Sequence, residues 1–529
     1  MIRLRQVKVD ILKDTKEEIL KKVTRQLNIN KSDIKDLKII KKSLDARKKD
    51  QLFFVYELDI STTNDEKIVN EIKSKDVFIS NDKPYVFEKT GNKKLNNRPI
   101  IVGSGPAGLF CAYLLAENNY KPIIIERGEK IEDRIKTVEK FWNTNELNEE
   151  SNVSFGEGGA GTFSDGKLNT LIKDKEKRGH KAFQIFVENG ANEEILYEQK
   201  PHIGTDNLRK IVKNIRNKII SMGGEILYNT KLTDIEIENN KVKAIKVNNN
   251  RIIKTDILVL AIGHSARDTF KMLYEKGLTI KNKPFAVGVR VAHKQSIINE
   301  SQYKKFAKYL PPASYKLTYQ TKARRGVYSF CMCPGGYVVN ASSEKNRLVV
   351  NGMSNYKRET PIANSAIVVT ISENDYGTNP LAGIKYQEQL EEKAYIIGKG
   401  QIPIQLYKDF KEEKKTTSIN EESIAIKGHY TLSNLNCLLP KYISDSIKEA
   451  MPFFGTKIKD FDGDDTVMLG LESRTSSPVR IVRDENYISN IMGIYPCGEG
   501  AGYAGGITSS AIDGIKVAEA IAKVYKEVK

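Results

Sequence analysis

A short glycine-rich turn between two apolar runs constrains the fold of this chain more than any other feature. The turn, Gly103–Gly108, follows the apolar residues Pro99–Val102 and opens the longer apolar stretch Leu109–Ala116. This order predicts a strand, a tight turn and a helix. A GxGxxG turn at such a position holds the pyrophosphate of a dinucleotide against the free N–H groups at the helix N-terminus.

The three glycines of the turn, and the acid that follows the next apolar run, have distinct expected roles. Gly103 permits the tight turn, Gly105 lets the backbone approach a pyrophosphate, and Gly108 lets helix and strand pack closely. A second apolar run, Pro122–Ile125, ends at Glu126, whose carboxylate can accept hydrogen bonds from a ribose diol. Because strand, helix, second strand and acid are in register, we predict a dinucleotide site rather than a bland glycine-rich turn.

The composition is that of a large globular protein. A chain of 529 residues is long enough for roughly two to four domains with a large core. It has no apolar run of about 18 residues, and Met1–Arg5 lacks the apolar core of a signal peptide. Five scattered cysteines fit a reducing compartment. We therefore expect a cytoplasmic protein without a membrane span.

The formal net charge of +18 and the pI near 9.3 leave two interpretations of the surface. A basic protein attracts polyanions, so nucleic acid is a conceivable partner, and any basic face would lie in the first 98 residues. Lysines and acids are nevertheless interspersed along almost the whole chain, which is typical of a solvated lysine-rich surface. We favour the solvated surface over a nucleic-acid interface.

Residues 1–95 have the pattern of a small separate α+β domain. The apolar periodicity predicts strand, helix, strand, strand, helix and a further strand, which is the order of a ferredoxin-like unit. A polar linker, Gly91–Asn97, follows. The expected elements are Leu4–Ile11, Thr15–Leu27, Ile34–Leu44, Leu52–Ile60 and Asn64–Ile72.

The nucleotide-binding unit begins after this linker but is not completed in one piece. A buried strand, Asp256–Ile262, stops abruptly at Gly263, and from about Thr279 the pattern changes to short strands, aromatic residues and loops. Near its end the chain returns with one more strand, Gly493–Cys497, then glycines and a long helix. We predict an α/β fold in which a discontinuous Rossmann-like domain (99–278 and 485–529) carries an inserted α+β substrate domain (279–484).

The split arrangement favours FAD as the cofactor. NAD-dependent dehydrogenases usually finish their nucleotide domain in continuous βαβ units. The return of the chain instead resembles the two-domain flavoproteins related to glutathione reductase, in which an acid after such a strand meets the ribityl chain. Glu499, after Gly498, takes that position. The helix after Gly505-Gly506 would direct its N-terminal N–H groups at the flavin pyrimidine, where reduced flavin carries negative charge.

A third glycine-rich segment, Phe155–Leu168, contains too many glycines for a stable helix or strand. We expect its backbone to approach a flat ligand closely. Thr162 and Ser164 offer hydroxyls, Lys167 could lie near flavin N5 or N1, and Asp165 could pair with it. The alternative is a surface loop with a solvated Asp–Lys pair.

Several segments resemble a widespread bacterial family of uncharacterised FAD-dependent dehydrogenases in the FAD/NAD(P)-binding oxidoreductase superfamily. They span residues 99–529, and the N-terminal domain also fits the family's layout. The resemblance implies FAD but little about the substrate, because the family has no assigned reaction. Ala292 departs from the acid expected before His293, which weakens a catalytic role for that histidine. The segments are Gly103–Gly108, Phe155–Leu168, Pro284–His293, Tyr328–Gly336, Glu472–Arg480 and Tyr495–Ile507.

Few catalytic side chains are expected, because flavin accepts the hydride itself and the protein supplies position and charge. Arg290 lies in an apolar run and needs an anionic partner, either a structural carboxylate or that of a substrate. His293 could transfer a proton or bind an anion. Arg474 belongs to the polar run Glu472–Ser477, which either lines the flavin or forms a hinge. These three residues and Lys167 are our catalytic candidates.

Two further features of the sequence argue against a redox disulfide, a metal site or a second dinucleotide site. Cys331 and Cys333 form a CxC, but an extended Phe330–Pro334 run would not readily bring the two sulfurs together, and no second Cys/His cluster is nearby. We therefore expect neither a redox disulfide nor a metal site. No second GxGxxG follows a strand, so a nicotinamide donor, NADH or NADPH, would at most bind transiently in the inserted domain.

The sequence thus predicts an FAD-dependent oxidoreductase that transfers a hydride between flavin N5 and a small anionic substrate. Two alternatives stay open, namely a flavin-dependent tRNA-modifying protein and a flavin-binding module without turnover. The predicted cofactor-binding residues are Gly103, Ser104, Gly105, Pro106, Ala107, Gly108, Glu126, Arg127, Gly161, Thr162, Ser164, Asp165, Lys167, Leu232, Gly263, Gly498, Glu499, Gly505, Gly506 and Ile507.

Overall fold

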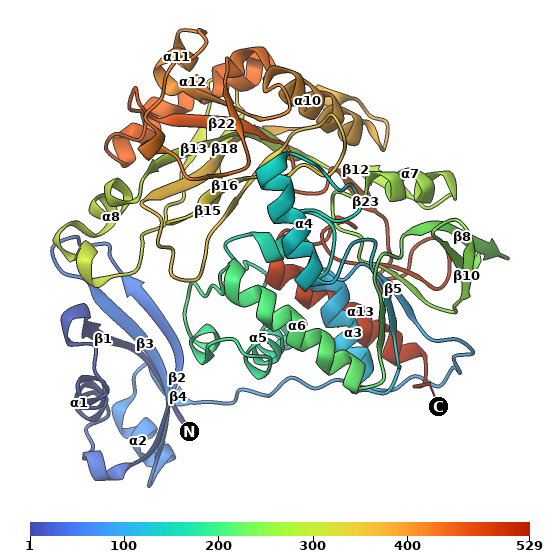
Figure 1. The fold of residues 1–529 in the computed structure, drawn as a ribbon. Coiled ribbons are helices and arrows are strands. Elements are labelled where there is room, and N and C mark those ends of the chain that lie inside the picture. Colours follow the sequence, from blue (N-terminus) through green and yellow to red (C-terminus); the bar gives the residue numbers. More distant parts are fainter. Residues whose placement is uncertain (529) are drawn as a thin grey trace.

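The N-terminal part of the chain forms a four-stranded antiparallel sheet with two helices, drawn in dark blue in Figure 1. The strand order is β2-β3-β1-β4. The Thr15 side chain caps the first helix, and the apolar face of that helix packs on the sheet. In this computed structural model, which describes residues 1–528, the elements are β1 (Ile2–Asp10), α1 (Lys16–Leu27), β2 (Ile34–Asp45), β3 (Phe53–Thr62), α2 (Asp65–Ile72) and β4 (Val77–Ile79).

An extended segment, residues 80–98, joins this sheet to the rest of the molecule, and we call it the strap. The strap runs along the end of the C-terminal helix, where Gly91 N–H donates to Ala522 O at 2.9 Å and Lys93 N–H donates to Val524 O at 3.1 Å. A Cβ at Gly91 would lie 2.4 Å from the Tyr525 nitrogen, so only glycine allows this close approach. The polar segment expected to be a linker is therefore held against the protein.

The central part is a five-stranded parallel sheet, β24-β11-β5-β6-β7, with α3, α5, α6 and α13 on one face and a small antiparallel sheet with α7 on the other. Successive strand residues alternate between the two cores. The elements are β5 (Ile100–Val102), α3 (Pro106–Glu117), β6 (Ile123–Ile125), α4 (Ile131–Thr144), α5 (Arg178–Glu188), α6 (Thr205–Ser221), β7 (Glu225–Leu227), β8 (Leu232–Glu238), β9 (Lys241–Val247), β10 (Arg251–Lys254), β11 (Leu258–Leu260), α7 (Arg267–Glu275), β24 (Ile494–Pro496) and α13 (Ile507–Val524).

The third part is a seven-stranded mixed sheet, β14-β15-β18-β13-β22-β19-β21, with a three-stranded sheet and helices packed around it. Its central strand β13 is buried along nearly its whole length. The elements are β13 (Phe285–Lys294), α8 (Gln295–Tyr303), β14 (Thr318–Gln320), β15 (Gly326–Cys333), β16 (Tyr337–Asn340), β17 (Val350–Met353), β18 (Ile362–Ile371), α9 (Glu373–Tyr376), α10 (Ala382–Ile397), β19 (Ile402–Leu406), α11 (Tyr407–Lys411), β20 (Ile426–Lys427), β21 (Tyr430–Leu432), α12 (Lys441–Lys457) and β22 (Val467–Glu472).

The two chain segments that connect the central and third parts lie side by side. They form the antiparallel pair β12 (Ile280–Asn282) and β23 (Val479–Ile481). The mixed α/β fold with a Rossmann-like sheet agrees with the sequence prediction, and the chain leaves and re-enters the parallel sheet through this single pair of strands.

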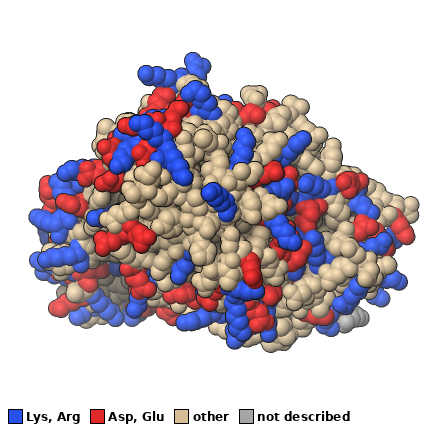
Figure 2. Space-filling view, turned by 45° about the horizontal axis from the view of Figure 1, so that its top comes forward, with Lys and Arg blue, Asp and Glu red and all other residues tan. Residues whose placement is uncertain are grey.

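The surface charge is mixed on the face shown in Figure 2, where lysine and arginine are interspersed with aspartate and glutamate among many uncharged residues. This agrees with the interspersed charges of the sequence. Within residues 1–528, the helices are either too short or too polar to cross a lipid bilayer.

Candidate functional site

One long cavity opens at the carboxyl ends of strands of the parallel sheet, the position at which such sheets bind ligands. Glu126, directly after β6, and Glu499, shortly after β24, both line it, so two acids far apart in the sequence face the same space. The predicted cofactor-binding residues that line it are Gly103, Gly105, Pro106, Ala107, Glu126, Arg127, Gly161, Ser164, Asp165, Lys167, Leu232, Gly263, Glu499, Gly505, Gly506 and Ile507.

The glycine turn has the geometry that a pyrophosphate site requires. Gly103 has φ of +100°, and a Cβ there would lie 2.4 Å from Ala261 O. A Cβ at Gly108 would lie 1.9 Å from Gly103 O, so this glycine permits the close packing of α3 on the turn. A Cβ at Gly105 would meet only Gly159 Cα, at 3.8 Å. The space in front of Gly105 is therefore open, and phosphate oxygens would fit against the N-terminus of α3.

Glu126 organises the turn more fully than the sequence suggests. Its Oε2 accepts hydrogen bonds from the backbone N–H and the hydroxyl of Ser104, at 2.9 and 2.7 Å. Its Oε1 accepts from the backbone N–H groups of Gly128 and Gly156, each at 3.0 Å. These four bonds use the acceptor sites of a carboxylate. A ribose hydroxyl could bind Glu126 only after the Ser104 hydroxyl turns away.

The third glycine-rich segment is shaped from behind by a residue that the sequence analysis missed. Arg134, on α4, is fully buried and donates to the carbonyl oxygens of Asn152, Val153, Glu157 and Gly159. Its hydrogen bonds fix the loop that forms one wall of the cavity. The sequence does not reveal this role, because Arg134 is one charged residue among several on an amphipathic helix.

Four predicted cofactor ligands lie behind the cavity wall. The Thr162 hydroxyl accepts a hydrogen bond from Arg134 and donates to Gly159 O, each at 2.8 Å, so it fixes the loop instead of facing the cavity. Gly498 N–H donates to Asp513 Oδ2 at 2.7 Å. Ser104 and Gly108 are held within the glycine turn, as described above.

Lys167 and Asp165 meet as expected, but Asp165 has a stronger partner. The Asp165 carboxylate receives two hydrogen bonds from Arg358, at 2.6 and 3.1 Å, whereas Lys167 Nζ lies 3.7 Å away. Burial raises the pKa of Asp165, but the charges of Lys167 and Arg358 hold it below its usual value. Lys167 therefore keeps its ammonium available, with 30% of its side chain exposed.

The other cations that line the cavity are tightly paired. Arg127 binds Glu150 at 2.7 Å and Asp268 at 3.0 Å, and its guanidinium stacks over the Phe155 ring at 4.1 Å. Lys231 lies 2.7 Å from the same Asp268. These charges stabilise the protein around the glycine turn and leave little net attraction for a ligand anion.

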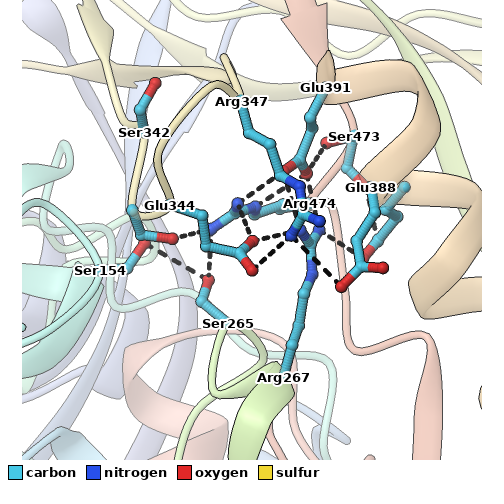
Figure 3. A network of polar contacts seen from close by, with 12 residues as sticks. Ser154, Ser265, Arg267, Ser342, Glu344, Arg347, Glu388, Glu391, Ser473 and Arg474 are labelled. Atoms are coloured by element: carbon cyan, nitrogen blue, oxygen red, sulfur yellow. Dashed lines mark hydrogen bonds and ion pairs between the residues drawn. The ribbon is translucent and has the colours of Figure 1, made fainter. Parts of the chain in front are cut away.

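Arg474 lines the cavity at the edge of a buried ionic network (Figure 3). Its guanidinium binds the Glu391 carboxylate at 2.6 and 2.9 Å and also the hydroxyls of Ser265 and Ser343. Arg267 binds the other side of the same carboxylate at 2.7 and 2.9 Å. Despite its burial, Glu391 has a pKa held well below the usual value by these two arginines. Arg474 is thus fixed by protein groups beside the cavity.

The structure does not bring Arg290 or His293 to the cavity. Arg290 is fully buried and pairs with Glu472 at 2.9 Å and with Asn364 at 2.7 Å, which satisfies its need for an anion within the protein. His293 faces the protein interior, where its ring stacks on Phe461 and its Nε2 lies 2.8 Å from Phe461 O. Burial lowers the pKa of His293 to about 4, so it stays neutral.

Two carboxylates face the cavity with unusual titration. Burial raises the pKa of Glu472 to about 7 although Arg290 opposes this, and burial raises the pKa of Glu499 to about 7 against the charge of Lys283. Within residues 1–528, no protein group hydrogen-bonds the Glu499 carboxylate. A half-buried carboxylate that lines the cavity without a protein partner fits the ribityl hydroxyls of FAD, which would supply the missing donors.

We use two names for the ends of the cavity. The turn end is formed by Gly103–Ala107, Glu126 and Arg127, and the polar end is formed by Lys167, Cys331, Asn351, Glu472 and Glu499. Cys331 and Asn351 were not predicted as site residues. The first glycines of α13, Gly505 and Gly506, also line the cavity, so the positive end of an 18-residue helix faces it.

Comparison with protein families agrees with a cofactor-binding site built on a Rossmann-like sheet. Residues 284–475 match the family "FAD-dependent protein, C-terminal domain-like", residues 101–149 match an NAD(P)-binding Rossmann-like domain, and residues 1–61 match a domain of unknown function. An uncharacterised protein of Clostridium beijerinckii is 45% identical over 521 residues, which cover 97% of each chain.

Solved structures give more distant similarities. Glycine oxidase from Bacillus cereus is 13% identical, covers 80% of this chain and 94% of its own, and has a TM-score of 0.33. L-Proline dehydrogenase from P. horikoshii is 14% identical, covers 81% and 93%, and has a TM-score of 0.32. Similarities at this level are too remote to support an inference about the reaction of this chain.

The Rossmann-like sheet, the glycine turn and the matched families define an FAD-dependent flavoprotein, with FAD as its cofactor. Within that class, the chain belongs to the same family as the uncharacterised clostridial protein. The resemblance noted in the sequence is thereby confirmed.

Proposed function

We propose that this protein transfers a hydride between FAD and a small anionic substrate bound at the polar end of the cavity. FAD, when bound, supplies the redox chemistry through its flavin ring. The observation that carries the proposal is the continuity of the cavity, which joins the glycine turn, Glu499, the N-terminus of α13 and Lys167. The residues of the turn end would hold the adenosine diphosphate part, and Glu499 would hold the ribityl chain.

Lys167 is the residue that favours an anionic substrate. The nearest carboxylate to its Nζ is 3.7 Å away, whereas Arg127, Lys231 and Arg474 each have one at 2.7 Å or closer. Because Arg358 neutralises Asp165 at shorter distance, the positive charge of Lys167 is left to act on the cavity. We assign it the role of attracting and orienting the substrate anion.

The N-terminus of α13 has a separate role. Gly506 is its N-cap and has no side chain to bind the first N–H groups, so these groups remain available to a ligand. They would stabilise negative charge that develops on the cofactor side of the cavity. The glycines at this position also leave room for close approach, since a Cβ at Gly505 would meet nothing within 4 Å.

The test has two stages. The purified protein should be yellow and hold FAD, and anaerobic mixing with NADH or NADPH should bleach it if a nicotinamide is the donor. Benzoate, a small carboxylate, should then perturb the absorption of the bound flavin. Colourless protein that takes up no FAD would remove the basis of the proposal.

Lys167→Gln should weaken benzoate binding about tenfold, which is about 1.4 kcal/mol. The matched control is Lys254→Gln, which removes an exposed lysine on β10, outside the cavity. The control should bind benzoate like the wild type. Equal affinities for all three proteins would show that Lys167 does not select the anion.

A further inference from the structure

We propose that Cys331 and Cys333 form a redox-active dithiol at the polar end of the cavity, which undergoes exchange with a disulfide substrate. This goes beyond hydride transfer and adds a second kind of chemistry to the same site. The exchange itself needs only the two cysteines and a disulfide. Its failure can therefore be distinguished from a failure of the protein to bind FAD or to transfer a hydride.

A β-bulge is the reason that the two cysteines lie together. In the pairing of β15 with β18, Phe330 is opposite Ala366 and Cys333 is opposite Asn364, so two residues of β15 face one residue of β18. Cys331 takes the left-handed conformation, with φ of +43°. The bulge interrupts the regular extended run that the sequence predicts. The expectation that the two sulfurs cannot meet depends on that run.

The bulge gives the two thiols different surroundings. Cys331 lines the cavity and is partly exposed, whereas Cys333 is fully buried immediately behind it. Cys333 Sγ lies 3.4 Å from the carbonyl oxygen of Cys331. Gly352 leaves room for this arrangement, since a Cβ there would lie 2.7 Å from Cys333 Sγ and 2.4 Å from Arg290 Nη1. One thiol is therefore accessible to a ligand, and the other lies two residues further along the chain, where the bulge ends.

The charges around the pair favour a thiolate on Cys331. The neighbouring Cys333 thiol holds the pKa of Cys331 well below its usual value, and Lys167 and Arg290 act in the same direction. Burial and Asp165 oppose this shift. The pKa of Cys333 is correspondingly raised. Such a division, with one nucleophilic thiolate and one protonated partner, is the arrangement that dithiol exchange requires.

Two further acids, Glu472 and Glu499, act on Cys331. Their negative charges would disfavour a thiolate if both were ionised. Burial raises the pKa of each to about 7, so at neutral pH and below a large part of that negative charge is absent. Burial lowers the pKa of Arg290, but the charge of Glu472 raises it above its usual value, so Arg290 keeps its charge over the same range. The Cys331 thiolate is therefore opposed least in mildly acidic to neutral solution.

The exchange balances with the substrate as the oxidant. The Cys331 thiolate attacks one sulfur of the substrate, forming a mixed disulfide and releasing the first substrate thiolate, which takes up a proton. Cys333 then loses its proton and attacks Cys331 Sγ, forming the Cys331–Cys333 disulfide and releasing the second substrate thiol. Two protein thiols and one disulfide thus become one protein disulfide and two thiols. Exchange with an added dithiol such as dithiothreitol returns the pair to the reduced state.

The remaining cysteines provide internal comparisons. Cys111 and Cys497 are fully buried, and burial raises the pKa of each thiol. Cys437 is exposed and lies outside the cavity. Cys497 also lines the cavity, but its side chain is fully buried. Of the cysteines in the described chain, only Cys331 both lines the cavity and is partly exposed.

The first experiment treats the full-length, flavin-loaded protein with oxidised glutathione and maps its peptides by mass spectrometry. We expect a peptide that contains Cys331 and Cys333 and has lost two hydrogens, and dithiothreitol should reverse the change. Cys333→Ser should instead retain one glutathione on Cys331. Cys437→Ser is the matched control and should form the internal disulfide like the wild type. Absence of the internal disulfide in the wild type overturns the proposal.

The second experiment measures the pH dependence of alkylation of each thiol by iodoacetamide. The midpoint for Cys331 should lie below about 8.5, the ordinary value for a cysteine, because the thiolate is the reactive form. In Cys333→Ala the midpoint should rise toward that value, because alanine removes the thiol that stabilises the Cys331 thiolate. A midpoint at or above the ordinary value in the wild type would overturn the assignment of Cys331 as the nucleophile.

Discussion

The turn end and the polar end of the cavity are built in contrasting ways. The turn end consists of two segments close together in the sequence, where Glu126 accepts hydrogen bonds from Ser104, Gly128 and Gly156 and Arg127 is paired with Glu150. The polar end is assembled from five segments, and it holds a partly exposed lysine, a thiol and two carboxylates with raised pKa values. Satisfied groups favour binding in a fixed geometry, whereas unsatisfied and perturbed groups are typical of reactive sites.

The largest expected effect separates binding from folding within the turn end. Gly105→Val should abolish FAD binding while the protein stays folded, because the side chain would enter open cavity space. Gly108→Val should instead prevent correct folding, because its Cβ would lie 1.9 Å from Gly103 O. Flavin absorption and circular dichroism of the two purified variants distinguish the outcomes. Stoichiometric FAD in Gly105→Val would contradict the placement of the pyrophosphate.

The next prediction concerns the wall behind the polar end. Arg290→Met should lower the free energy of unfolding by about 3–5 kcal/mol, because it leaves the Glu472 carboxylate buried without its cation. Urea unfolding followed by tryptophan fluorescence measures this change. The double variant Arg290→Met/Glu472→Leu should recover much of the loss. If the single variant were as stable as the wild type, the pair would not be holding this wall.

The smallest effect is a pH dependence of stability in flavin-free protein. The folded pKa of Glu499, about 7, lies above the ordinary value of 4.5, so the folded state binds the proton more tightly. The stabilisation is therefore fully present below about pH 4.5 and is lost as the pH rises through about 7. Glu499→Gln should show a smaller decrease in melting temperature between these pH values. Parallel curves for the two proteins would contradict the raised pKa.

The sequence could predict the turn end because each element there is encoded locally. A strand, three glycines and a helix follow one another within Pro99–Ala116, and their steric roles can be inferred from residue type alone. Glu499 and the N-terminus of α13 could also be predicted from the sequence, because a strand followed by glycines has a recognisable pattern. The mixed α/β class followed from the same signals.

The polar end could not be predicted in the same way, because its chemistry depends on long-range contacts. Whether Arg290 meets a substrate or Glu472 depends on the pairing of β13 with β22, which no local pattern reveals. The bulge at Cys331 depends on the register of β15 against β18. The sequence predicts that Thr162 faces a ligand, but its hydroxyl instead binds the buried Arg134. Arg134 lies on a helix whose amphipathic pattern gives no indication of this contact.

The strap has a consequence for how the molecule is made. Its residues Gly91 and Lys93 are synthesised more than four hundred residues before their partners Ala522 and Val524. The strap can therefore bind α13 only after that helix has been synthesised. A chain truncated before Ala522 would lack both hydrogen bonds.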